Sequence, residues 1–277
     1  MTEPVSDYRI FTHPFLKLGT CSWSTRDWVN RLYPADAPQR EYIAHYARYF
    51  DAVEVDATFY GTPRRQVLEG WRERTPENFS FAVKAPQVIT HERFLENCGE
   101  ELKTFLTAMD LLGGRLGPVL FQFPYFSRKK GVTQRDFVER LAAFLPLLPK
   151  GRLFAVEVRN KGWLTPRLLD LLRQHNVATT LIDHPWMAPP DDLFDRDGIV
   201  TGPFVYVRWL GDRYDIERIT TVWSDHVLDR EDDMRRWVPG IRGLLDMRVQ
   251  VYGFVNSHYS GYAPGDAARF QRLLNEG

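Results

Sequence analysis

Cysteine is scarce in this sequence, with only Cys21 and Cys98 among 277 residues. The two form neither a CxxC pair nor a disulfide framework, and no zinc signature joins them to the histidines. These absences exclude a disulfide-stapled secreted domain and the common structural zinc sites. They favour a reducing compartment, the cytoplasm.

An excess of charge of either sign is also missing, because 36 Lys and Arg balance 36 Asp and Glu. Without a net charge, no long-range field draws the molecule to nucleic acid or to an anionic membrane. The first fifteen residues hold no apolar stretch of signal-peptide length, and no later run approaches a membrane span. We expect no membrane partner, no favoured nucleic-acid partner, and only local selectivity for anions.

The sequence lacks a phosphate loop, a dinucleotide-binding glycine fingerprint, an HExxH helix and a Gly-x-Ser-x-Gly elbow. Kinase, Rossmann dehydrogenase, zinc protease and serine hydrolase therefore lose their usual support.

Eight short apolar runs of strand length are present, and amphipathic helical segments separate most of them. Strands that alternate with helices predict a parallel sheet, and eight such units favour closure. We therefore predict a single (β/α)8 TIM-type barrel domain over residues 1–277, with an open sheet as the alternative. The predicted strands are 18–23, 52–56, 80–84, 119–123, 153–159, 178–183, 204–209 and 249–255. The predicted helices are 40–50, 64–74, 100–112, 134–145, 165–175, 231–245 and 266–274, with Thr165 as an N-cap before Pro166 and an elaborated loop over 184–203.

Period-two alternation sorts the strand side chains, so that Val53 and Val55 should face the helices while Glu54 and Asp56 face inward. Polar residues recur on this inward phase near the carboxyl ends of the strands, where a barrel of this type places its chemistry. The predicted mouth of the barrel contains Glu54, Asp56, Lys84, Gln122, Glu157, Arg159, Asp183, Arg208 and Asn256.

Five blocks of the sequence combine strand residues with polar or aromatic residues: Gly19 to Trp23, Val53 to Tyr60, Gly117 to Pro124, Ala155 to Arg159 and Tyr252 to Asn256. They resemble blocks of the YecE-like family, which carries the domain of unknown function number 72. The blocks run through nearly the whole chain in the family's order. The resemblance implies a TIM-type barrel and no particular reaction. The family usually has Asn where Asp56 stands.

Glu54 and Glu157 are the candidate acid and base of a hydrolase, lyase or isomerase. Lys84 and Arg159 would offset developing negative charge, and His91 would act as a proton shuttle from a nearby loop. The alternative is an ion-pair network that only holds the barrel closed.

We expect the substrate to be a small polar, sugar-like or phosphorylated molecule. Its expected binding residues are Asp56, Tyr60, Gln122, Asp183, Arg208, Asn256, Trp23 and Tyr262. Tyr262 belongs to the segment 261–265 that leads into the last helix, where related barrels bind phosphate. Arg159, Arg208 and the loop 127–130 would add charge to that site. Trp28, Trp163, Trp186, Trp223 and Tyr259 also follow strands and are further candidates to line the pocket. Trp71 and Trp237 should pack outside the barrel.

We expect no cofactor. A divalent metal is an alternative, because His184 and His258 stand beside Asp183 and Asn256, but three cations in the same mouth oppose it. The second hypothesis for function is a non-catalytic binding protein for a nucleotide, a metabolite or single-stranded nucleic acid.

Overall fold

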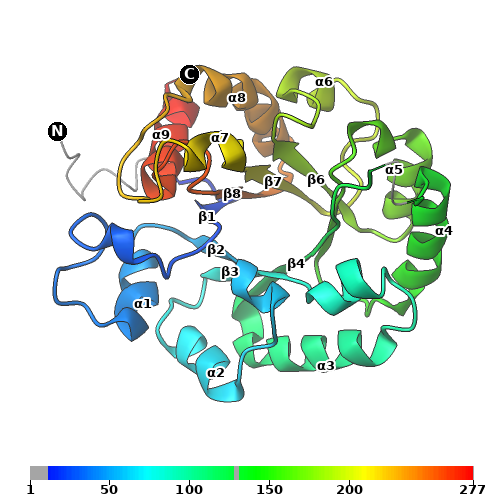
Figure 1. Ribbon diagram of the computed structural model, residues 1–277, viewed down its shortest axis with the longest axis horizontal. Helices are drawn as coiled ribbons and strands as arrows, with labels where there is room; N and C mark the ends of the chain where they lie inside the picture. Colours follow the sequence, from blue (N-terminus) through cyan, green and yellow to red (C-terminus); the bar gives the residue numbers. More distant parts are fainter. Residues whose placement is uncertain (1–11, 128–130, 277) are drawn as a thin grey trace.

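The fold was analysed in a computed structural model that describes residues 12–127 and 131–276. Eight parallel strands form one sheet in the order β1-β8-β7-β6-β5-β4-β3-β2, and β1 and β2 lie in contact. The sheet thus curls into a nearly closed barrel that confirms the predicted TIM-type fold (Figure 1). The strands are β1 Leu16–Thr20, β2 Ala52–Val55, β3 Ser80–Lys84, β4 Leu116–Gln122, β5 Phe154–Glu157, β6 Ala178–Asp183, β7 Phe204–Trp209 and β8 Gln250–Val255.

The helices surround the strands and follow the predicted segments (Figure 1). Two short helices, α6 and α7, were not predicted, and α6 lies inside the interval 184–203 that was expected to be an elaborated loop. The helices are α1 Tyr42–Tyr46, α2 Arg65–Glu73, α3 Gly99–Met109, α4 Gln134–Phe144, α5 Pro166–Gln174, α6 Pro190–Phe194, α7 Arg213–Glu217, α8 Glu231–Asp246 and α9 Ala263–Asn275.

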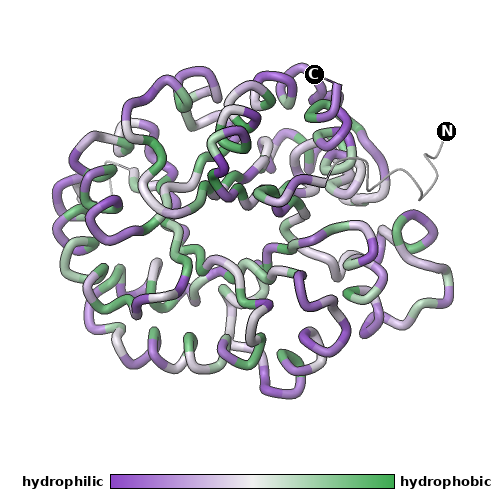
Figure 2. The backbone as a smooth tube through the Cα atoms, turned by 180° about the vertical axis from the view of Figure 1, so that it is seen from behind, coloured by the Kyte–Doolittle hydropathy of each residue, from purple (hydrophilic) through white to green (hydrophobic). Residues whose placement is uncertain are grey.

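The apolar core lies mainly between the outer face of the barrel and the helices. Val53, Val55, Phe81 and Val83 are all buried there, as alternation predicted. Figure 2 shows hydrophobic segments around the central strands and hydrophilic segments on the outer helix surfaces. Burial of such side chains stabilises the fold by about 25 cal/mol per Å² of apolar surface.

The seam between β1 and β2 is closed by a helix side chain. The Tyr46 hydroxyl of α1 accepts a hydrogen bond from the Thr20 amide at 2.8 Å and contacts the Ala52 carbonyl oxygen at 3.1 Å. Gly19 allows this close approach, because a Cβ at that position would lie 1.9 Å from the Ala52 oxygen. The missing side chain at Gly19 is therefore part of the barrel closure.

The first strand differs from its predicted bounds. Strand β1 begins at Leu16 and ends at Thr20, two residues before the predicted start and three before the predicted end. Thr165 does occupy the N-cap of α5, but no hydrogen bond caps the helix through its side chain; its hydroxyl instead accepts a hydrogen bond from the Gln134 amide at 2.8 Å. Of the predicted cationic loop 127–130, residues 128–130 lie outside the described residues.

Among the described helices, none is long and apolar enough to cross a membrane.

Candidate functional site

Arg208 on β7 is the centre of a buried polar cluster inside the barrel. Its Nη2 donates to Glu54 Oε1 at 2.6 Å, and its Nη1 donates to Glu157 Oε2 at 2.7 Å. Strands β2, β5 and β7 each present one of these residues on the inward phase. Alternation therefore sorted them correctly, and the sheet curvature brings them together.

Each carboxylate has a second donor. The Tyr206 hydroxyl donates to Glu54 Oε2 at 2.6 Å, and Arg159 Nε donates to Glu157 Oε1 at 2.7 Å. Charge-assisted hydrogen bonds of this kind offset the large cost of burying ions. Glu54, Glu157 and Arg208 are almost completely buried, with side-chain exposures of 0%, 0% and 2%.

The two glutamates differ in proton affinity. Burial and the neighbouring Asp56 carboxylate raise the pKa of Glu54, against the opposing effect of Arg208. Burial alone would also raise the pKa of Glu157, but the Arg208 and Arg159 guanidiniums outweigh it and lower that pKa to about 2. Glu157 therefore stays ionised, whereas Glu54 is the carboxyl group that takes up a proton more readily.

The buried cluster of Glu54, Glu157 and Arg208 forms the floor of the barrel mouth. Asp56 and Lys84 lie above this floor, and both side chains are partly exposed to solvent. Lys84 Nζ and Arg208 Nη2 each lie 3.6 Å from Asp56 Oδ1. This oxygen is buried and has no hydrogen-bond partner among the residues described. The Asp56 and Lys84 side chains are 36% and 12% exposed, so both border the buried floor and the surface.

An aromatic residue connects Lys84 with His91. Lys84 Nζ lies 4.2 Å from the centre of the Phe59 ring, and the His91 ring packs against the same ring with centroids 4.8 Å apart. The Thr90 hydroxyl lies 2.8 Å from His91 Nδ1. His91 is thus beside the Lys84 end of the mouth, with Phe59 contacting both, but it lies in the helical turn Val88–Glu92 and not in a loop.

Two cavities reach the mouth next to β1 and share Cys21, Ser22 and Asp56 in their walls. One of about 410 Å³ extends toward Trp23 and Trp71. The other, of about 220 Å³, extends toward Trp28, Trp223, Asn256 and His258. Asp56 therefore lines both cavities, each of which also has two tryptophans in its wall.

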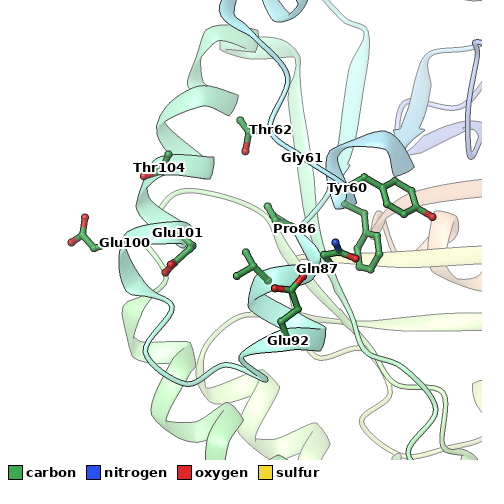
Figure 3. A pocket seen from close by; sticks show the side chains of 11 residues that line it. Tyr60, Gly61, Thr62, Pro86, Gln87, Glu92, Glu100, Glu101 and Thr104 are labelled. Carbon is green, nitrogen blue, oxygen red and sulfur yellow. The ribbon is translucent and has the colours of Figure 1, made fainter.

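A third cavity of about 430 Å³ begins at the Phe59 and Tyr60 turn after β2. Figure 3 shows Glu100, Glu101 and Thr104 of α3 on one side and Tyr60 on the other. Tyr60 is 79% exposed and lines this outer cavity, whereas Asp56 does not. Its expected place at the rim agrees with the structure, but it belongs to a different cavity.

Asp183 was expected in the mouth and lies elsewhere. It pairs in register with Trp209, whose ring packs outward against Trp237 of α8. Trp237 Nε1 and the Tyr259 hydroxyl donate to Asp183 Oδ2 at 2.8 and 3.2 Å. Burial raises the pKa of Asp183, and these two donors oppose the rise. The carboxylate therefore faces the helix layer and not the barrel interior.

Two predicted aromatic binding residues pack mainly against other side chains. Trp23 packs against Trp71 and Phe81 on the outer side of the barrel, with ring centroids 4.9 and 6.2 Å apart, although its edge lines a cavity. Tyr262 is 6% exposed and packs against His226 at the start of α9. The prediction that Trp71 packs outside the barrel is correct.

Gln122 and Asn256 are on the predicted inward phase, with roles that the sequence did not indicate. Gln122 pairs in register with Glu157, and its amide donates to the Phe123 carbonyl. Asn256 Oδ1 accepts hydrogen bonds from the His258 amide at 2.9 Å and contacts His258 Nδ1 at 2.6 Å. Glu217 on α7 lies 3.1 Å from the other ring nitrogen of this histidine.

The start of α9 is not the open anion site that the segment 261–265 suggested. The buried Asp266 carboxylate fills the first turn and accepts a hydrogen bond from the Ser260 hydroxyl. The Val227 and Leu228 amides bond to the Ser260 carbonyl at 2.7 and 3.1 Å and cover the turn. A second negative charge here would be repelled by Asp266.

No group of three or more His, Cys, Asp and Glu side chains is arranged to hold a metal within residues 12–127 and 131–276. His184 and His258 do not meet in one cluster with Asp183, which faces outward. The mouth residues that are close together alternate in charge, with Lys84, Arg159 and Arg208 each beside a carboxylate.

Two site residues were missed by the sequence reasoning. Tyr206 lies two residues before Arg208 on the same inward phase, and that parity was an available signal for it. Cys21 is buried beside Glu54, and burial, with the Glu54 carboxylate, raises the pKa of its thiol well above the usual range. No pattern in the sequence marked Cys21.

Comparison with known proteins gives consistent relatives. The family model described as protein of unknown function DUF72 matches residues 17–277. UPF0759 protein YecE of Escherichia coli is 31% identical over 171 residues, which span 60% of this chain and 58% of the relative. UPF0759 protein YunF of Bacillus subtilis is 30% identical over 181 residues, covering 61% and 60% of the two chains. The match thus spans less than two thirds of either relative. The crystal structure of a DUF72 family protein from Thermotoga maritima is 26% identical, with a TM-score of 0.74 and coverage of 95% of this chain and 100% of that one.

Proposed function

The chain belongs to the DUF72 family, and we propose that it is an enzyme that performs acid and base chemistry at the barrel mouth on a small anionic substrate such as a phosphorylated sugar. Neither the family description nor the names of the relatives states a reaction. The proposal therefore depends on the site itself. In barrels of this type the carboxyl ends of the strands carry the chemistry.

The observation that carries the proposal is the arrangement around Asp56. Two cationic groups, Lys84 Nζ and Arg208 Nη2, each lie 3.6 Å from Asp56 Oδ1, slightly beyond hydrogen-bond distance. A substrate oxygen in this region would receive positive charge from two sides and have a carboxylate beside it to exchange a proton. Those are the requirements for hydrolysis, elimination or isomerisation through a stabilised oxyanion.

The residues have distinct proposed roles. Lys84 and Arg159, which are 12% and 22% exposed, bind the anionic group. Asp56 transfers the proton, in place of Glu54 and Glu157, because both glutamates have no exposed side-chain surface. Glu54 and Glu157 are positioning residues that fix the Arg208 guanidinium from both ends. Holding this cation in place lowers the reorganisation needed when negative charge develops.

Proton nuclear magnetic resonance in deuterium oxide tests the proposal with a panel of phosphorylated aldoses and ketoses. This readout detects deuterium exchange, isomerisation and phosphate release in one experiment. We expect turnover of at least one compound, and we expect Asp56→Asn to lower it by about 100-fold or more, the usual effect of removing a general acid or base. Asp170→Asn is the matched control, because this carboxylate pairs with Arg173 on the surface of α5.

The binding arm uses inorganic phosphate and isothermal titration calorimetry. Lys84→Met should weaken binding of phosphate about tenfold or more, because it removes a partly exposed cation from the mouth. Binding that depends on Lys84 without turnover of any panel compound would support the non-catalytic binding protein instead. Failure of phosphate to bind would contradict both.

A further inference from the structure

Two large aromatic side chains are exposed side by side at the ends of β4 and β6. Tyr125 is 48% exposed and Trp186 is 45% exposed, whereas most aromatic residues of this chain are buried. Their ring centroids lie 5.4 Å apart with the planes tilted by 56°. The two residues come from different loops, so the fold itself brings these rings together at the surface.

Hydrogen bonds connect the first ring to the strand end that carries Arg159. The Phe126 amide, next to Tyr125, donates to Asn160 Oδ1 at 2.9 Å, and Asn160 Nδ2 donates to the Phe126 carbonyl at 2.9 Å. Asn160 directly follows Arg159 in the chain. The Asn160 side chain therefore bonds to both the N–H and the C=O of Phe126, and these two hydrogen bonds hold the loop after β4 against the loop after β5.

The second ring, Trp186, is held by His184 in its own loop. The Trp186 amide donates to His184 Nδ1 at 3.1 Å, and the two rings meet at 4.8 Å in an edge contact. Burial and the nearby Arg159 guanidinium lower the pKa of His184, so this histidine also lies within the electrostatic reach of Arg159. In the sheet β5 lies between β4 and β6, so Arg159, which follows β5, lies between the loops that carry Tyr125 and Trp186.

Exposed aromatic surface has a cost, because each Å² of apolar area left in water forgoes about 25 cal/mol of burial. Pro124 and Pro185 stand directly before these two aromatic residues, and each fixes one backbone dihedral of the loop that carries the ring. Rings held in this way lose little conformational entropy when a ligand packs on them. A flat apolar face beside a cation is suited to a ligand that joins a ring to an anionic group.

We propose that Tyr125 and Trp186 form a ring-binding subsite next to Arg159, which takes the sugar or base ring of a phosphorylated substrate. This inference rests on the proposed function, in which Lys84 and Arg159 bind the anionic group. It adds the part of the ligand that the charged residues do not recognise. Sugars and bases both present a face to aromatic rings, and the ligands chosen for the test distinguish them.

Calorimetric titration with inorganic phosphate, ribose 5-phosphate and adenosine monophosphate tests the subsite. We expect at least one ring-bearing anion to bind tenfold or more tightly than inorganic phosphate. A gain with ribose 5-phosphate identifies the sugar as the bound ring, and a gain only with adenosine monophosphate identifies the base. Trp186→Ala and Tyr125→Ala should each remove about tenfold of this gain and leave the affinity for inorganic phosphate unchanged.

Two controls separate loss of the ring from loss of the fold. Trp186→Phe keeps an aromatic face and should retain most of the gain. Met247→Ala removes a side chain that is 68% exposed at the end of α8 and should change no affinity. Equal affinity for all three ligands, or a gain that survives both alanine variants, would overturn the subsite while phosphate binding still supports the proposed function. Absence of phosphate binding in the wild type would overturn the proposed function first and the subsite with it.

Discussion

Glu54 and Arg208 are 154 residues apart in the sequence, yet Arg208 Nη2 lies 2.6 Å from Glu54 Oε1 inside the barrel. The same guanidinium reaches Glu157 through its other terminal nitrogen at 2.7 Å. One side chain thus joins β7 to both β2 and β5. The candidate site and the closed shape of the barrel consequently depend on the same residue.

Replacement of Arg208 by Met should lower the free energy of unfolding by about 3 to 5 kcal/mol, because it leaves two buried carboxylates without their shared cation. Urea denaturation measures the change. Arg235→Met is the control, since this half-exposed arginine pairs on the surface with Glu231 and Glu276 and should contribute about 1 kcal/mol or less. Equal effects of the two substitutions would show that the buried network does not stabilise the barrel.

Glu157 should make the wild type sensitive to acid. Its pKa is about 2 in the folded chain, below the value of about 4.3 expected when unfolded. A depressed folded pKa contributes stability that is present above the unfolded pKa and is lost as the pH falls toward the folded one. The contribution is on the order of 3 kcal/mol.

Unfolding free energies measured from pH 6 down to pH 2.5 check this sign. Glu157→Gln removes the titrating group, so its stability should fall less steeply over this range than that of the wild type. Parallel curves for the two proteins would mean that Glu157 has an ordinary pKa in the folded state.

Gly19→Ala should destabilise the barrel by about 3 kcal/mol, because the added Cβ would lie 1.9 Å from the Ala52 carbonyl oxygen at the seam. Gly162→Ala is the matched control, since a Cβ there meets no atom within 4 Å. Thermal denaturation of both variants measures the difference. If Gly19→Ala melted like the wild type, β1 and β2 would have to be farther apart than described.

Both cysteines should be protected from thiol reagents in the native protein. Cys21 and Cys98 are 5% and 1% exposed, and burial raises the pKa of each thiol. Because the thiolate is the reactive form, labelling with iodoacetamide at pH 7.5 should be slow in buffer and fast in denaturant. Fast native labelling of Cys21, located by peptide mass spectrometry, would indicate that the mouth opens next to β1.

The fold was predictable because each strand is a short apolar run and the pattern changes to helical spacing after most of them. Alternation also placed Glu54, Glu157, Arg159 and Arg208 on one interior face correctly. It failed at Asp183, since the run from Ala178 to Asp183 does not alternate strictly and the polar residue at its end was given the wrong phase. Trp23 follows the end of β1, where the period of two no longer holds, and it lines a cavity with Asp56 while its ring packs against Trp71.

The sequence did not predict how deeply each inward side chain is buried. Parity states which face a side chain occupies, but not how much the neighbouring strands cover it. Glu54 and Glu157 were therefore expected to act on substrate, whereas the curvature of the sheet buries both beneath Asp56 and Lys84. The start of α9 is covered by residues 225–228, which contact Ser260 and Asp266. These residues are distant from α9 in the sequence, and no local pattern marks the contact.

The position of the seam has a consequence for how the chain is made. Among the described strands, β1 has a single hydrogen-bonded neighbour, β8, while its contact with β2 relies on the Tyr46 hydroxyl. Strand β1 thus finds its ladder partner only after all the other strands of the barrel have been synthesised. Until then Leu16 and Leu18 have no sheet edge to join, so the barrel closes through the contact that is most distant in the sequence.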